Sequence, residues 1–193
     1  MSRESMLKRI RAQKIQALPY PEEQVDAQTF EDVAGHFAEV LELVGGECRT
    51  MAPGQSVADA LAGDERYTGK VVNLVEGGPE STLDLATIAG PHDLADVNLA
   101  IIRGEFGVAE NAAIWVPEPL MGARALPFIT QHLVIVIPAA SLVHTMHQAY
   151  ERVSADGLGF GVFISGPSKT ADIEQSLVVG AHGARSLTVL LEG

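Results

Sequence analysis

The residues of this chain best suited to chemistry lie in one short stretch near its C-terminus. The apolar residues 161–164 predict a buried strand, and a helix is expected over residues 170–179. Hydroxyls, an ammonium and the backbone N–H groups at a helix start together suit a carboxylate or a phosphate. We therefore predict a binding site for a small anionic metabolite in the turn between them, formed by Ser165, Gly166, Ser168, Lys169 and Thr170.

The same turn could instead be a capped connection that binds nothing. Thr170 is a suitable N-cap, and Asp172 would complement the dipole of the following helix. Such caps occur at most helix starts, so the spacing alone leaves both interpretations open.

Two nucleotide-binding motifs resemble this stretch without matching it. In a P-loop, lysine directly follows the second glycine, whereas Pro167 and Ser168 follow Gly166 here. Pro167 also lacks one of the N–H groups that would hold a phosphate. Gly157, Gly159 and Gly161 precede the predicted strand, whereas the glycines of the dinucleotide fingerprint follow one.

Glu110 and His132 are the candidate catalytic residues. His132 opens a nearly continuous apolar run, and Glu110 lies in an apolar region, where a carboxylate must be paired, hydrogen-bonded or functional. A histidine hydrogen-bonded to the backbone would give the same pattern. Glu105 is five residues from Glu110, so the two would lie on opposite faces of a continuous strand and do not predict a carboxylate pair.

We predict neither a metal site nor a cofactor. His144 and His147 are three apart on a predicted helix, but no HExxH pattern or third ligand accompanies them. Cys48 is the only cysteine, and an iron–sulfur cluster needs about four cysteine-type ligands.

The elements that must position these residues alternate between strand and helix. Helices are predicted over residues 2–17, 29–44, 56–61 and 141–153, the last capped by Ser141. Strands are predicted near residues 48–51, 70–75, 97–102, 107–117, 132–137, 161–164 and 187–191. This order predicts an α/β fold with a mostly parallel, Rossmann-like sheet flanked by helices. Ligands in such folds bind outside the carboxyl ends of the strands, so we expect the anion site there.

Charge divides the chain into a basic arm and an acidic body. The net charge of −12 disfavours nucleic acid as a partner, yet residues 1–14 carry about +4 and the remainder −16. We predict an N-terminal helical arm with a proline-containing linker over residues 1–28 and one domain over residues 29–193. The arm could dock a partner or a second copy in a homo-oligomer, or be a solvated helix face. No stretch has the length of a membrane span or the apolar core of a signal peptide, so we expect a cytoplasmic protein.

Several segments, in order along the chain, resemble the lactate-utilisation C family of LUD-domain proteins. Ile164-Ser-Gly-Pro-Ser-Lys-Thr-Ala-Asp-Ile-Glu174 and Val179-Gly-Ala-His-Gly-Ala-Arg185 match its C-terminal signature. Glu105-Phe-Gly-Val-Ala-Glu-Asn-Ala112 is similar to its acidic–Phe–Ala–Ile–Ala–Glu–Thr–Gly segment. Pro127 and His132 match its proline and histidine, and residues 2–11 resemble its first helix. Asn111-Ala112 departs from the family's Thr-Gly, which removes a hydroxyl and a residue free to adopt positive φ.

The resemblance implies a fold like that of the CoA-transferase and sugar-phosphate-isomerase superfamily. It also implies a role in oxidising L-lactate to pyruvate together with iron–sulfur companion proteins. Because this chain has a single cysteine, we expect a non-redox subunit or assembly partner. The alternative is a stand-alone enzyme or sensor for a phosphorylated, CoA-linked or carboxylate metabolite.

Overall fold

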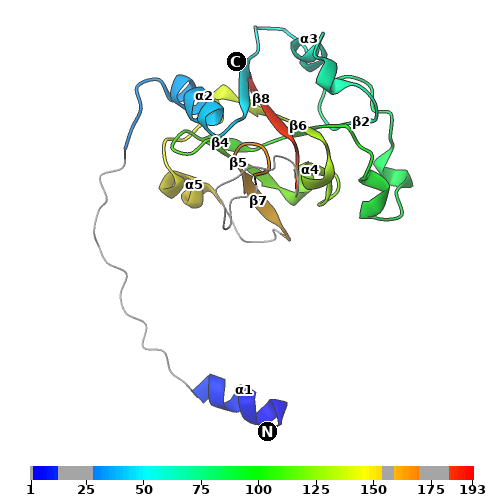
Figure 1. Cartoon of the computed structure of the whole chain (residues 1–193). Helices are drawn as coiled ribbons and strands as arrows, with labels where there is room; N and C mark the ends of the chain where they lie inside the picture. The colour runs from blue at the N-terminus through cyan, green and yellow to red at the C-terminus, as the bar shows by residue number, and fades with distance from the viewer. Residues whose placement is uncertain (1, 13–27, 154–158, 170–182) are drawn as a thin grey trace.

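Five parallel strands form the central sheet, in the order β1-β8-β6-β3-β2, of which β8, β6 and β2 are labelled in Figure 1. The computed structural model describes residues 2–12, 28–153, 159–169 and 183–193. The strands of this sheet are β1 (Glu47–Thr50), β2 (Val71–Asn73), β3 (Leu99–Arg103), β6 (His132–Pro138) and β8 (Ser186–Glu192). The prediction of a mostly parallel α/β fold is therefore confirmed.

A second, antiparallel sheet contains β4 (Phe106–Val108), β5 (Ala113–Pro117) and β7 (Gly161–Ile164). The prediction that β7 is a buried strand of the C-terminal parallel unit is wrong, because β7 pairs antiparallel with β5 and is half-buried. An apolar run indicates a strand but not its partner. The partner here is favoured by aromatic packing, with the Phe163 ring 4.8 Å from that of Trp115.

Each face of the central sheet has its own apolar core. On one face, Leu133, Ile135 and Val189 pack with Phe37 and Leu41 of α2 (Val33–Leu43). On the other, Val134, Val136 and Leu190 pack with Val57 and Leu61 of α3 (Val57–Leu61). Side chains of a strand alternate between faces, so the near-continuous apolar run of β6 serves both cores.

Side chains cap the predicted helices, in one case at a different residue. Asp32 caps α2, which starts later than predicted, and Ser56 caps α3 as predicted. α5 (Met146–Arg152) starts after Thr145, so the prediction that Ser141 caps this helix is wrong. The backbone of Val143 bonds to Gly107 and Ala109 beside β4, which keeps residues 142–145 out of the helix.

The remaining elements are short. They are α4 (Leu126–Ile129) and the 3-10 turns Glu65–Tyr67, Leu85–Thr87, Pro91–Leu94, Glu118–Leu120 and Ala139–Ser141. The helix predicted over residues 170–179 lies outside the described residues. No helix in the described parts is long and apolar enough to cross a membrane.

The N-terminal element is α1 (Arg3–Ala12), which falls inside the helix predicted over residues 2–17. None of its residues is buried, and Met6 and Ile10 are exposed. Residues 13–27 lie outside the described residues, so the division at residue 28 remains a prediction.

Candidate functional site

The turn after β7 lies beside the turn between β4 and β5. In the antiparallel pair β5·β7, Ile164 is opposite Ile114, so the end of β7 meets the start of β5. The Ser165 hydroxyl donates a hydrogen bond of 2.7 Å to the carbonyl of Asn111. The fold thus brings together two segments, residues 105–112 and 164–169, that lie more than fifty residues apart in the sequence.

A pocket of about 270 Å³ opens along this turn. Its walls are Pro127, Phe128, Leu133, Ile164, Ser165, Gly166, Pro167, Ser168, Lys169, Gly183, Ala184 and Leu187. Leu133 and Leu187 are the second residues of β6 and β8, so the pocket lies at the amino ends of these strands. The expectation that the pocket would lie at the carboxyl ends of the parallel strands is wrong. β7 belongs to the other sheet, and its carboxyl end lies near the amino ends of β6 and β8.

Gly166 allows the turn to pass close to the end of α2. Its φ of 71° is in the left-handed region, and a Cβ at this position would lie 2.7 Å from the carbonyl oxygen of Val44. Any other residue would therefore be both strained and in contact with backbone. Gly166 shapes the pocket and is buried there.

Ser168 and Lys169 supply the free polar groups of the pocket. The Ser168 backbone N–H donates to the Ala184 carbonyl at 2.9 Å, which fixes the turn against the start of β8. Within the described part of the chain, neither the Ser168 hydroxyl nor the Lys169 ammonium has a hydrogen bond or ion pair. Such a hydroxyl and such an ammonium can donate hydrogen bonds to a carboxylate or phosphate.

The Lys169 side chain also lies near the C-terminal end of α2. A Cβ built on Gly45 would be 3.6 Å from the Lys169 Nζ, and Gly45 directly follows the last turn of that helix. Helix C-termini carry partial negative charge, so the ammonium is favoured there without a ligand. The position of Lys169 is thus compatible with both interpretations of the turn. Thr170 lies outside the described residues.

Glu110 holds the start of α5. Its carboxylate accepts a hydrogen bond of 2.8 Å from the backbone N–H of Met146, the first residue of that helix. Its own backbone N–H donates to the carbonyl of His144 at 3.0 Å. A carboxylate at a helix N-terminus stabilises the helix, which accounts for Glu110 structurally.

His132 belongs to the opposite face of the sheet from the pocket. Its Nδ1 lies 2.7 Å from the Ser186 hydroxyl, and its ring meets the edge of Tyr67. Burial lowers the pKa of His132, and the charges of Arg66 and Arg185 lower it further, so the imidazole is neutral near pH 7. Because Glu110 and His132 have separate partners, the structure does not join them as an acid–base pair.

His144 and His147, which were considered as metal ligands, are also separated. His144 precedes α5 and accepts a hydrogen bond of 3.0 Å from the Phe30 backbone N–H, whereas His147 lies within the helix. The prediction that both histidines lie on one helix is therefore wrong. Among the described residues, no group of three or more His, Cys, Asp or Glu is placed to hold a metal ion.

A four-membered ionic network next to His132 was not predicted. Arg49 bonds Glu47 and Asp64 at 2.6 and 2.7 Å, and Arg66 bonds the same two carboxylates. The Arg66 guanidinium, with a smaller contribution from Arg49, holds the pKa of Asp64 far below its usual range. No local pattern could reveal this network, because Glu47 and Arg66 are nineteen residues apart.

Comparison with known proteins finds one matching family and several similar proteins. Residues 86–191, just over half of the chain, match the LUD domain. Two curated relatives are named lactate utilization protein C. The one from Exiguobacterium sp. is 36% identical over 120 residues, covering 58% of this chain and 48% of the relative. The one from Geobacillus kaustophilus is 33% identical over 92 residues, covering 45% of this chain and 38% of the relative. The matches thus span less than half the length of these relatives.

A solved structure is similar in fold. The crystal structure of a DUF162 family protein from Deinococcus radiodurans aligns with a TM-score of 0.59 at 18% identity. The alignment covers 83% of this chain and 96% of that one. At this level of identity, the similarity extends to the fold alone.

Proposed function

The chain belongs to the LUD-domain family, and from this membership we propose that it is a non-redox subunit or assembly partner of an L-lactate utilisation system. The name of its relatives, lactate utilization protein C, supports the role. Removing two electrons from lactate requires a redox centre. The chain has one cysteine, and burial raises the pKa of that Cys48 thiol to about 11, which disfavours the thiolate form that binds metal. Iron–sulfur companion proteins would therefore carry the electrons.

We further propose that the pocket beside the β7 turn binds a small carboxylate such as lactate or pyruvate. The observation that carries this proposal is a pair of polar groups at the edge of a pocket of suitable size, the Ser168 hydroxyl and the Lys169 ammonium, which have no partner among the described residues. The ammonium would form a charge-assisted hydrogen bond with the carboxylate, and Ser168 would orient it. The side chains of Leu133 and Leu187 would pack against the methyl end of the ligand. Roles for Ser165, Gly166 and Thr170 remain part of the same proposal.

Purification from the native cells tests the partnership. A tagged copy of the chain, isolated without oxygen from cells grown on L-lactate, should co-elute with iron and acid-labile sulfide in a fixed ratio to the chain. The same preparation made at high salt should lose both if the contact is ionic. A chain that elutes alone under both conditions, at physiological expression, would contradict the assembly role.

The Lys169 ammonium could equally bind a phosphate, which is consistent with a second candidate function. A stand-alone enzyme or sensor would use the pocket for a phosphorylated, CoA-linked or carboxylate metabolite. Titration calorimetry with L-lactate, pyruvate and inorganic phosphate identifies the class of ligand, and binding of phosphate alone would favour the second function. If lactate or pyruvate binds, co-elution with iron and sulfide favours the assembly role, and elution alone favours a carboxylate sensor or enzyme.

A further inference from the structure

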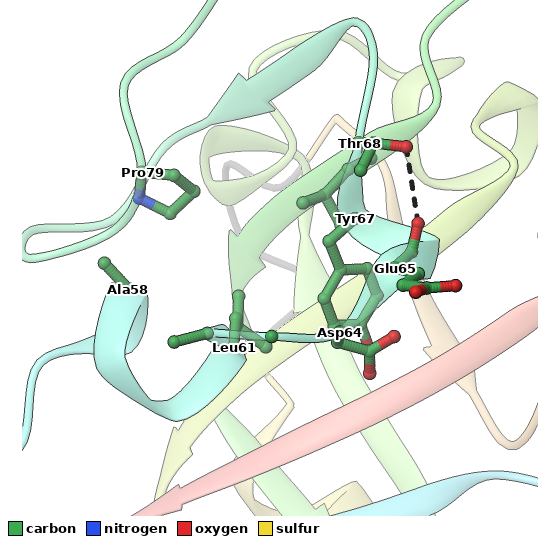
Figure 2. A pocket seen from close by; sticks show the side chains of 10 residues that line it. Ala58, Leu61, Asp64, Glu65, Tyr67, Thr68 and Pro79 are labelled. Carbon is green, nitrogen blue, oxygen red and sulfur yellow. Dashed lines mark hydrogen bonds between the residues drawn. The ribbon is translucent and has the colours of Figure 1, made fainter.

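An apolar pocket of about 420 Å³ lies beside α3, on the sheet face opposite the β7 turn. Figure 2 shows Ala58 and Pro79 facing Tyr67 across the hollow, with Leu61 at its base. Leu99, the first residue of β3, completes the apolar lining. The pocket has room for more than one aliphatic side chain.

Exposed carboxylates lie in the lining of this pocket and next to it in the sequence. Glu65 lines the pocket, whereas Asp59 and Glu80 directly follow the lining residues Ala58 and Pro79. Asp64 also lines the pocket, but its charge is balanced by Arg49 and Arg66. Within the described residues, no ion pair involves Asp59, Glu65 or Glu80. An apolar hollow lined by Glu65, with two further acidic residues beside it in the sequence, suits a segment that is both apolar and basic.

α1 is such a segment. Over Arg3–Ala12 it carries four basic residues and one acidic residue, a net charge of +3. Met6 and Ile10 are four residues apart, so they share one face of the helix, and they are 49% and 65% exposed. A helix this short is marginal in water without a packing partner, so its apolar face needs a surface to cover it.

We propose that the pocket beside α3 is the docking site for α1 of a second copy of this chain. Met6 and Ile10 enter the hollow between Pro79 and Tyr67, and the basic side chains of α1 lie against Glu65 and its acidic neighbours. Each copy offers one helix and one pocket, so two copies form a closed dimer with two identical contacts.

Sedimentation velocity of the full chain tests this, over about 1–100 µM. We expect a monomer–dimer equilibrium at low salt that shifts toward monomer at about 0.5 M salt, where surface charges are screened. Ile10→Asp, and separately Glu65→Lys with Glu80→Lys, should each weaken dimerisation at least about tenfold. All three changes are at exposed residues, so thermal melts should match that of the wild type. Leu43→Asp is the control, because Leu43 is 84% exposed but lies on α2.

Mixing the two variants decides between a second copy and the same copy. One variant keeps an intact pocket and the other an intact helix, so the mixture should recover a heterodimer with one of the two contacts. A wild-type chain that stays monomeric throughout would overturn the proposal. So would a dimer that Ile10→Asp leaves unchanged, or a monomer in which α1 of the same copy protects the pocket from hydrogen exchange.

Discussion

Single residues at the β7 turn must satisfy both the fold and the proposed ligand. Gly166 adopts φ 71° against Val44, and Ala112, at the neighbouring turn, adopts φ 53° while fully buried. The second position was noticed in the sequence, because Ala112 stands where the segment that it resembles has a glycine, the residue that adopts positive φ most readily. The carbonyl that accepts the Ser165 hydroxyl belongs to Asn111, one residue before this strained position.

Lys169→Met should weaken binding of L-lactate or pyruvate by ten- to a hundredfold, because a charge-assisted hydrogen bond contributes about 1.5–3 kcal/mol. The free energy of unfolding should change by less than about 1 kcal/mol, since only an interaction with the end of α2 is lost. Titration calorimetry and a thermal melt measure the two effects. Lys70→Met, at a lysine outside this pocket, is the control for loss of charge alone. A large loss of stability without any change in binding would instead show that the turn is a structural connection.

Gly166→Ala should destabilise the chain more than Gly54→Ala. Both glycines have positive φ, 71° and 77°, so both substitutions incur the left-handed strain of about 1–2 kcal/mol. Only at position 166 would the new Cβ meet backbone, whereas nothing lies within 4 Å of it at position 54. Urea unfolding should show a further loss of about 1–3 kcal/mol for Gly166→Ala. Equal losses would mean that the turn moves away from Val44 without cost.

At the scale of elements, strands were easier to predict from the sequence than their partners. The run of apolar residues in β6 and the glycines after α2 are local signals, and the structure confirms both elements. The position of β7 depends on Trp115 and Phe106, more than forty residues away, which no local pattern contains. The start of α5 depends on the bonds between Val143 and β4 in the same way. Because β7 was assigned to the parallel sheet, the pocket beside its turn was also predicted at the wrong end of that sheet.

The ionic network joins two elements, β1 and the segment after α3. Arg49 also donates to the carbonyl of Ala60 at 2.9 Å, so it holds α3 against the sheet. Burial raises the pKa of Glu47, but Arg49 and Arg66 outweigh it, and the pKa of Asp64 is lowered as well. Carboxylates with lowered pKa stabilise the fold above their unfolded-state pKa values and lose this contribution as pH falls further.

Stability should therefore fall as the pH drops below about 5, where the unfolded-state carboxylates begin to bind protons. In Arg66→Met, Asp64 and Glu47 lose a partner, so the fall between pH 5 and 3 should be shallower than in the wild type. Chemical denaturation at a series of pH values measures this slope. Lys70→Met, which breaks the exposed pair with Asp96, should leave the slope nearly unchanged. Identical slopes for the wild type and Arg66→Met would contradict the role of the network.

At the scale of the whole molecule, motifs along the chain indicate the fold class and the family, whereas charge and exposed apolar side chains indicate the role of α1. The α/β class and the LUD family were predicted from motifs that cover the chain, and the comparisons confirm both. The lactate role and the anion pocket are proposals, since the matched relatives extend beyond the aligned region. The sequence showed only that residues 1–14 are basic and the remainder acidic. The structure adds the apolar pocket beside α3, with Glu65 in its lining.

Growth on lactate tests the central claim most directly. Deleting the gene in its native organism should abolish growth on L-lactate while leaving growth on pyruvate unchanged, because only the oxidation of lactate to pyruvate is blocked. The wild-type gene should restore growth, and Lys169→Met should restore it only in part. Undiminished growth on L-lactate in the deletion strain, with no second copy of the gene present, would contradict the account, as would an equal defect on both carbon sources.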